Sequence, residues 1–273
     1  MSGVFFERGF ERIFGTWPLE GTACEAAVEA ALEAGYRSID TATMYGNEAE
    51  VGRALAASGL PRDALFVTTK VRPDDFAADR FLPAVERSLD ALQLDRVDVL
   101  LVHWPPVGGN VRPSLDLLAE AHARGHARFV GISNYTAAML REAKAILPAP
   151  IAANQVEFHP LLDQRALLAA AAETGITLTA YASLARGEVL KQPVVQEIAA
   201  AYGKTPAQVT LRWILQHGVA PITMSTKPAN LRANFDVLGF TLSSVDMARL
   251  DALRSVGLRV VDKPRVPWAP VWD

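Results

Sequence analysis

The chain has 273 residues, of which 50% are hydrophobic, and a net charge of −3 from 27 basic and 30 acidic residues. The charge distribution shows no basic stripe for nucleic acid, and no apolar run is long enough to span a membrane. The single cysteine, Cys24, excludes an internal disulfide and fits a reducing compartment. Because Met1–Arg12 also lacks the apolar centre of a signal peptide, we expect a cytoplasmic protein.

One unit recurs along the chain: a short apolar or β-branched run, followed by an alanine-rich amphipathic run that ends at a glycine or a polar turn. The expected strands are Ile13–Thr16, Tyr36–Asp40, Leu65–Lys70, Val97–His103, Ala127–Ser133, Ile151–Glu157, Ile176–Tyr181 and Val219–Met224. The expected helices after them are Ala23–Ala34, Glu48–Ala57, Asp79–Leu92, Ser114–Arg124, Ala137–Leu147, Arg165–Thr174, Val194–Ala201 with Pro206–His217, and Ala229–Leu238.

Eight such units without a break in composition predict an α/β fold of the (β/α)8 TIM barrel type, as one domain over residues 1–273. Met1–Arg12 is expected to form a hairpin or a plug beneath the barrel, and Ser243–Leu253 an extra C-terminal helix. In the tail, Leu258–Asp273, three prolines exclude a regular helix: Pro264, Pro267 and Pro270. We interpret this tail as a lid, because Trp268 and Trp272 are costly to leave in water.

Polar and ionisable side chains stand where these apolar strands end. In a parallel barrel the strand ends open on one face, where barrel enzymes keep their active sites. Four residues there suit proton donation to a developing alkoxide: Asp40, Tyr45, Lys70 and His103. A buried Lys70 beside Asp40 would keep its charge and lower the pKa of the Tyr45 phenol, while His103 could orient an oxygen. Taken singly, Lys70 could be a simple ion pair and His103 a core histidine. The five histidines show no ligand cluster, so we expect no metal.

The chain resembles the aldo-keto reductase family from end to end. The matching segments are Phe14–Trp17, Gly35–Ala42 with Tyr45–Glu48, Thr68–Lys70, Leu101–Pro105, Val130–Asn134 and Asn154–Glu157. Within the family, the bacterial branch of 2,5-diketo-D-gluconate and methylglyoxal reductases is the most similar in three further segments: Thr205–Val209, Ser225–Lys227 and Ala269–Asp273.

The resemblance implies that hydride passes from a reduced nicotinamide to a carbonyl carbon. In this reading Tyr45 donates the proton, Lys70 polarises Tyr45, Asp40 holds Lys70 and His103 aligns the carbonyl. The residues implied to bind the cofactor are Gly15, Thr16, Trp17, Asp40, Ser133, Asn134, Gln155, Tyr181, Ser183, Leu184, Arg186, Ser225, Thr226, Lys227, Asn230 and Asn234. The substrate pocket would be formed by Trp17, Tyr45, His103 and Trp104, and the protein is expected to be a monomer.

The phosphate-binding segment departs from the family pattern. Met224 stands where a lysine is usual, Asn230 where an arginine is usual, and Ala233 where a glutamate is usual. Arginine–phosphate pairs are strong and bidentate, so the preference for NADPH should be weakened and NADH is possible. Lys227 and Arg232 could compensate.

Two other functions remain open at this point. A Schiff-base lyase would use Lys70 as a nucleophile, and a nucleotide-binding, redox-sensing partner subunit would need no catalysis. For the reductase, a short loop at Val107–Arg112 and a short tail favour a small carbonyl substrate, such as a dicarbonyl, keto ester or keto sugar.

Overall fold

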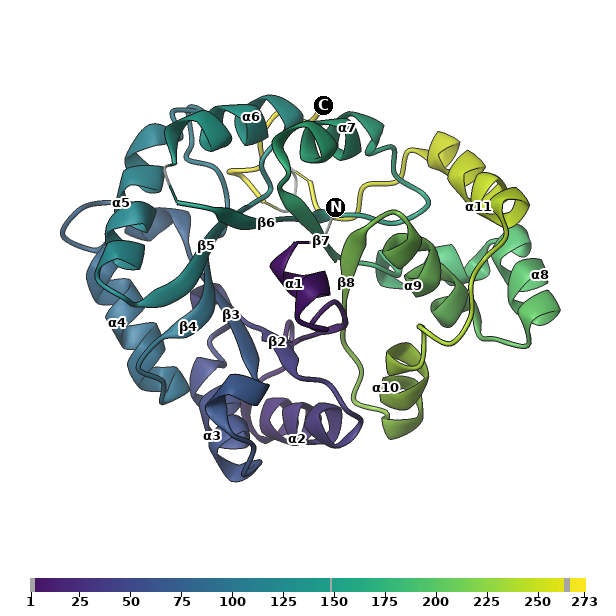
Figure 1. The fold of residues 1–273 in the computed structure, drawn as a ribbon, viewed down its shortest axis with the longest axis horizontal. Coiled ribbons are helices and arrows are strands. Elements are labelled where there is room, and N and C mark those ends of the chain that lie inside the picture. The colour runs from purple at the N-terminus through teal and green to yellow at the C-terminus, as the bar shows by residue number, and fades with distance from the viewer. Residues whose placement is uncertain (1–2, 148, 263–265) are drawn as a thin grey trace.

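The computed structural model describes residues 3–147, 149–262 and 266–273. Within them, parallel strands close into a barrel in chain order, and β1 pairs with both β2 and β8. The strands are β1 (Ile13–Gly15), β2 (Ser38–Asp40), β3 (Phe66–Val71), β4 (Val97–Val102), β5 (Ala127–Ser133), β6 (Ile151–Glu157), β7 (Thr177–Tyr181) and β8 (Val219–Thr223). Helices surround the barrel (Figure 1), so the predicted (β/α)8 architecture is confirmed.

The barrel helices lie near their predicted positions. They are α2 (Gly21–Glu33), α3 (Glu48–Ala57), α4 (Phe81–Leu92), α5 (Arg112–Ala123), α6 (Ala137–Ile146), α7 (Arg165–Thr174), α8 (Pro193–Tyr202), α9 (Pro206–Gln216) and α10 (Pro228–Phe235). Short 3-10 turns are η1 (Thr43–Tyr45), η2 (Arg62–Ala64), η3 (Pro73–Asp75), η4 (Ala185–Gly187), η5 (Val189–Lys191) and η6 (Ala252–Val256). Helix α5 begins two residues earlier than expected, because Pro113 is well placed in a first helical turn. None of the helices in the described residues could cross a bilayer.

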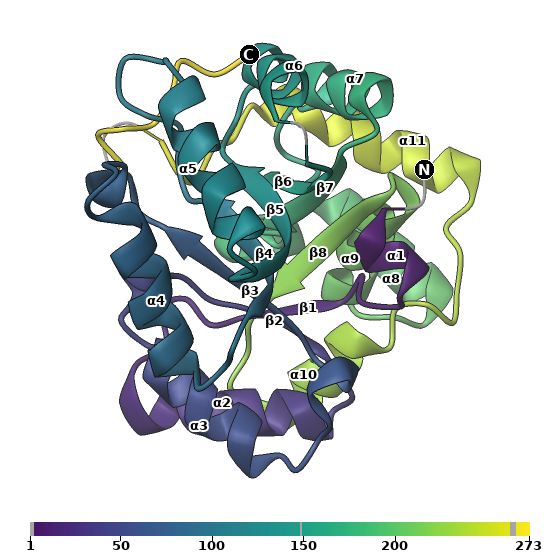
Figure 2. The same ribbon diagram turned by 60° about the vertical axis from the view of Figure 1, so that its left-hand side comes forward.

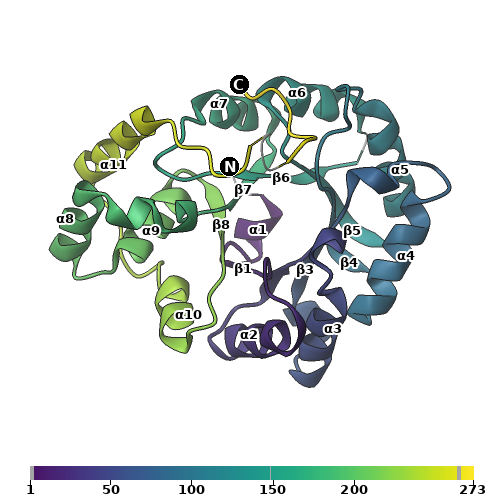
Figure 3. The same ribbon diagram turned by 180° about the vertical axis from the view of Figure 1, so that it is seen from behind.

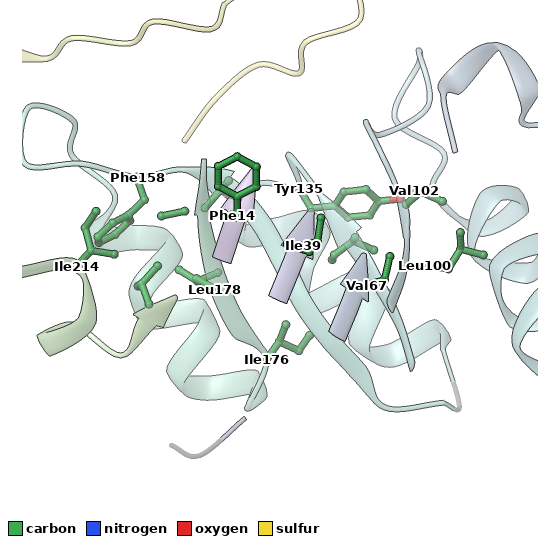
Figure 4. Close-up of a cluster of buried hydrophobic side chains, with 14 of the residues drawn as sticks. Phe14, Ile39, Val67, Leu100, Val102, Tyr135, Phe158, Ile176, Leu178 and Ile214 are labelled. Atoms are coloured by element: carbon green, nitrogen blue, oxygen red, sulfur yellow. The ribbon is translucent and has the colours of Figure 1, made fainter. Parts of the chain in front are cut away.

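Side chains of the central strands alternate between two apolar layers. On β4, Val99 and Leu101 point into a cluster that includes Phe66, whereas Leu100 and Val102 pack in the larger cluster beneath the helices. Figure 4 shows part of this outer layer. Every residue of β3, β4 and β6 is buried, as expected of strands covered on both faces.

The N-terminal segment plugs one end of the barrel. It forms α1 (Val4–Glu7), a single helical turn, so the hairpin alternative is wrong and the plug alternative is confirmed. The Phe5 ring meets the Phe66 ring edge-on at 5.0 Å, and the Phe10 ring stacks on it at 4.8 Å. This apolar contact closes the end of the barrel opposite the strand C-termini, and Figure 2 shows α1 there.

The C-terminal segment begins with the predicted extra helix, α11 (Ser244–Asp251), capped by the Ser243 side chain. Beyond Gly257, the described residues form no helix or strand. They run past the ends of β6 and β7, as Figure 3 shows from behind. Pro264 lies outside the described residues.

Candidate active site

A buried ion pair lies at the ends of β2 and β3. Lys70 Nζ lies 2.5 Å from Asp40 Oδ1 and donates to the Thr41 carbonyl at 2.8 Å. The other carboxylate oxygen of Asp40 accepts from Gln155 Nε2 at 2.7 Å. Lys70 is fully buried and Asp40 is 3% exposed. Because each charge has hydrogen-bonding partners, the pair can remain ionised away from water.

Tyr45 ends η1, the turn that follows β2, and its phenol meets this ion pair. Tyr45 Oη lies 3.3 Å from Lys70 Nζ, and the ammonium lies 4.9 Å from the ring centroid. The His103 ring meets the Tyr45 ring edge-on at 5.6 Å. The structure therefore brings together all four residues that the sequence placed in the catalytic group.

Burial dominates the acid–base properties of Tyr45. It raises the pKa of the phenol above 10, and the nearby Lys70 ammonium only partly offsets it. The expectation of a lowered Tyr45 pKa is thus wrong, because the sequence reveals the neighbouring cation but not the depth of burial. Burial also opposes the charge of Lys70, but Asp40 and Tyr45 outweigh it and raise the pKa of Lys70.

His103 is a neutral imidazole in this environment. Burial, helped by repulsion from Lys70, holds the pKa of His103 well below its usual value of 6.5. Within the described residues, His103 Nδ1 is buried without a hydrogen-bond partner. A neutral ring can still donate one N–H to an oxygen, so it can orient a carbonyl without carrying a charge.

Further polar residues, to which the sequence gave no role, hold the loop around Tyr45. Asn47 Nδ2 donates to the carbonyls of Thr16 and Leu19, and Asn47 Oδ1 accepts from Thr41 Oγ1 at 2.7 Å. The Glu48 carboxylate accepts from the hydroxyls of Thr69 and Ser88, at 2.5 and 3.1 Å. The signal for both was their place shortly after the phenol, where Asn47 is the N-cap residue of α3 and Glu48 begins it.

A second polar network spans the ends of β5, β6 and β7. Tyr181 Oη donates to Asn134 Oδ1 at 2.7 Å, and Asn134 Nδ2 donates to Ser133 Oγ and to the His103 carbonyl. Ser133 Oγ donates to the Gln155 carbonyl at 2.8 Å. Asn134 has φ +63°, a left-handed conformation that asparagine tolerates better than most residues. Four of the residues implied to bind the cofactor, Ser133, Asn134, Gln155 and Tyr181, therefore form one connected network beside the catalytic group.

The other predicted cofactor residues fall into two places. Ser183 is buried and donates to the carbonyls of Ala180 and Ile222, so its hydroxyl is already engaged. After it, Arg186 reaches across to Trp17, whose ring centroid lies 5.3 Å from the guanidinium carbon. Leu184, which lies between Ser183 and Arg186 in the sequence, is half-buried. Gly15 is the last residue of β1, and Thr16 follows it.

The second place is the segment between β8 and α10. Ser225 is half-buried, Thr226, Lys227 and Asn230 are exposed, and Asn234 is buried. No acidic residue occurs from 224 to 235. Backbone N–H groups at a helix start, together with hydroxyls and a lysine, suit a phosphate group.

The predicted lid lies beside the expected substrate side. The Trp272 ring contacts the Trp104 ring at 6.3 Å, and Trp104 stacks on His103 at 6.5 Å between centroids. Trp104 is almost fully buried, whereas Trp17 is 51% exposed. No cluster of potential metal ligands occurs among the described residues.

Comparison with known proteins shows the family of this chain. The family model "Aldo/keto reductase family" matches residues 12–255, and the chain belongs to this family. An aldo-keto reductase of Mycobacterium tuberculosis is 45% identical over 252 residues, which cover 92% of this chain and 89% of that protein.

Two solved structures share the fold. One, provisionally named 2,5-diketo-D-gluconic acid reductase B, aligns with a TM-score of 0.92 at 40% identity, over 96% of this chain and 93% of that one. The aldose reductase of Schistosoma japonicum aligns with a TM-score of 0.85 at 31% identity, over 91% and 89% of the two chains. The protein is thus an oxidoreductase of a family that reduces carbonyl groups with nicotinamide cofactors.

Proposed function

We propose that this protein reduces small aldehydes and ketones to alcohols with NADPH, and that Tyr45 donates the proton. The observation that carries the proposal is the buried contact of the Tyr45 phenol with Lys70, whose charge Asp40 maintains. As negative charge develops on the Tyr45 oxygen, the ammonium 3.3 Å away stabilises it. The neutral His103 ring orients the carbonyl oxygen towards the phenol.

The residues present fit a nicotinamide nucleotide. The polar network of Ser133, Asn134, Gln155 and Tyr181 stands beside Tyr45, and the segment 224–230 offers a cation and hydroxyls where a phosphate would bind. When bound, the reduced nicotinamide supplies the hydride. The protein binds and orients the reactants and holds the transferred proton on Tyr45.

The cofactor preference should be mild. Met224 is 39% exposed and uncharged, and Asn230 offers a neutral amide, so neither can pair with a 2′-phosphate as lysine or arginine would. Lys227 can still attract phosphate as a flexible point charge. We therefore propose NADPH as the preferred cofactor, with measurable use of NADH.

We propose small dicarbonyls, keto esters and keto sugars as the substrates. We also propose that the protein is a cytoplasmic monomer. The similar structure that is provisionally named after a diketo sugar acid supports this range. A Schiff-base lyase is disfavoured, because it requires a lysine with a lowered pKa and the pKa of Lys70 is raised. A purely nucleotide-sensing role is disfavoured, because all four catalytic residues are retained.

The test is oxidation of reduced nicotinamide with a panel of small carbonyl compounds, run with both cofactors. Tyr45→Phe should lower kcat by about 10²–10⁴-fold and leave cofactor affinity nearly unchanged, because only the donated proton is lost. Tyr202→Phe is the matched control, since this phenol on α8 binds Asp246 on α11. If Tyr45→Phe keeps more than about half of the activity, Tyr45 is not the general acid.

A further inference from the structure

The start of the tail is fixed to the barrel by a buried carboxylate. Glu157, the last residue of β6, is 1% exposed. Its oxygens accept from the backbone N–H groups of Val260 at 2.7 Å and Val261 at 3.0 Å. His159 Nε2 lies 3.0 Å from the first of these oxygens. Because the bonds go to the main chain, they fix the position of the preceding residue, Arg259.

Arg259 points to the aromatic side of the site. Its guanidinium carbon lies 4.0 Å from the Trp272 ring centroid, and Trp272 contacts Trp104, which stacks on His103. The charge of Arg259 also acts on the Tyr181 phenol. It favours a lower pKa of Tyr181, but the larger effect of burial raises that pKa. The cation therefore stands beside the Trp104–Trp272 pair and within electrostatic reach of Tyr181.

This cation has no anionic partner among the described residues. The Arg259 side chain makes no ion pair or hydrogen bond there, and its Nη1 is enclosed without a partner. The nearby carboxylate of Glu157 is used by backbone N–H groups, and Asp262 accepts from Trp272 Nε1 at 3.1 Å. Stacking on Trp272 occupies the face of the guanidinium, so the N–H donors along its edge are left for another acceptor.

We propose that Arg259 binds a carboxylate of the substrate, and that the preferred substrates are carbonyl compounds that carry a carboxylate, such as oxo acids and aldehyde acids. This rests on the proposed carbonyl reduction and adds the charge of the substrate to it. A guanidinium edge matches a carboxylate in a bidentate geometry, and a partly buried site strengthens the pair. The stack on Trp272 holds the guanidinium in place before the substrate arrives.

The anion is a substrate group rather than a cofactor phosphate. Figures 1 and 3 show the C-terminal segment beside α6 and α7, on the opposite side of the barrel from α10 and its candidate phosphate site. If instead Arg259 bound the nucleotide, its removal would weaken cofactor affinity. Titration of NADPH against the Arg259→Met variant therefore separates the two sources.

The kinetic test compares para-formylbenzoate with its methyl ester, which present the same aldehyde with and without a charge. Arg259→Met should raise KM for the acid by about 10- to 100-fold and change KM for the ester by less than about twofold, as expected on losing a charged hydrogen bond. For Arg259→Lys, KM for the acid should lie between those of the wild type and Arg259→Met, since lysine keeps the positive charge but lacks the bidentate donor geometry of the guanidinium. Arg254→Met removes the same charge from η6 and is the matched control.

A binding test does not depend on catalysis. Benzoate has no carbonyl to reduce, and calorimetry should show that Arg259→Met binds it about tenfold or more weakly than the wild type does. Equal KM changes for acid and ester, unchanged benzoate binding, or weakened NADPH binding would each overturn the proposal. If the wild type reduces neither the acid nor the ester with either cofactor, the proposed function fails instead, and the benzoate result still decides the role of Arg259.

Discussion

Replacing Lys70 with methionine removes the charge that faces the Tyr45 phenol while keeping the length of the side chain. At the observed 3.3 Å, a full ion–ion interaction amounts to about 5 kcal/mol with an effective dielectric constant of about 20. If about half a charge develops on the phenol oxygen in the transition state, the loss is about 2.5 kcal/mol, or about 10²-fold in kcat. The loss in kcat should equal or exceed that of Tyr45→Phe, because without Lys70 the Asp40 carboxylate faces the phenol as an unpaired charge.

The pH profile gives the second readout of this variant. Without the ammonium, the pKa of Tyr45 rises further, so the residual activity should persist to higher pH than in the wild type. The unpaired Asp40 should also cost about 3–5 kcal/mol of stability. The double variant Asp40→Asn, Lys70→Met removes both charges, and should regain much of that stability while remaining slow.

Steady-state reduction of a small aldehyde, measured with thermal unfolding of each variant, provides the test. A Lys70→Met enzyme that is well folded and active, with an unmoved alkaline limb, would refute the assigned role of Lys70. An imine trapped at Lys70 by borohydride with a keto substrate would favour the lyase.

Because the pKa of His103 lies well below 6.5, lowering the pH through about 6.5 should not protonate it, and kcat should stay flat there. An acid limb near that pH that disappears in His103→Gln would contradict this. Met224→Lys with Asn230→Arg should lower KM for NADPH, hardly change it for NADH, and make binding more sensitive to salt. Equal effects on both cofactors would place the phosphate site elsewhere. Glu157→Gln should raise substrate KM without changing kcat or cofactor affinity, because an amide nitrogen would face a backbone N–H of the tail; Glu173→Gln, an exposed acid on α7, should change nothing.

The barrel and the four central residues could be predicted from the sequence because their signals are local. Strand and helix patterns repeat along the chain, and charged residues such as Asp40 and Lys70 stand out at the ends of apolar strands. Register within a parallel sheet then brings those ends together without further information.

Contacts between distant segments had no comparable signal. The bond from Val260 to Glu157 spans 103 residues and uses a backbone N–H, which any residue but proline could supply. The α1 plug depends on Phe5 meeting Phe66, a contact that no nearby pattern predicts. The raised pKa of Tyr45 follows from how deeply it is buried, which is a property of the assembled barrel.

The two halves of the barrel contribute differently to the site. The groups proposed to handle the proton come from β2, β3, β4 and the turn after β2, whereas the polar network, the candidate phosphate segment and the tail come from β5 onwards. Gln155 to Asp40 and Asn134 to the His103 carbonyl are hydrogen bonds that join the halves. Mutant libraries confined to the tail and to the segment after β8 should therefore change which carbonyl compounds and which cofactor the protein accepts. The surroundings of Tyr45, the proposed proton donor, should stay unchanged in them. The protein is arranged so that selectivity can evolve separately from reactivity, provided that these two joining contacts are left alone.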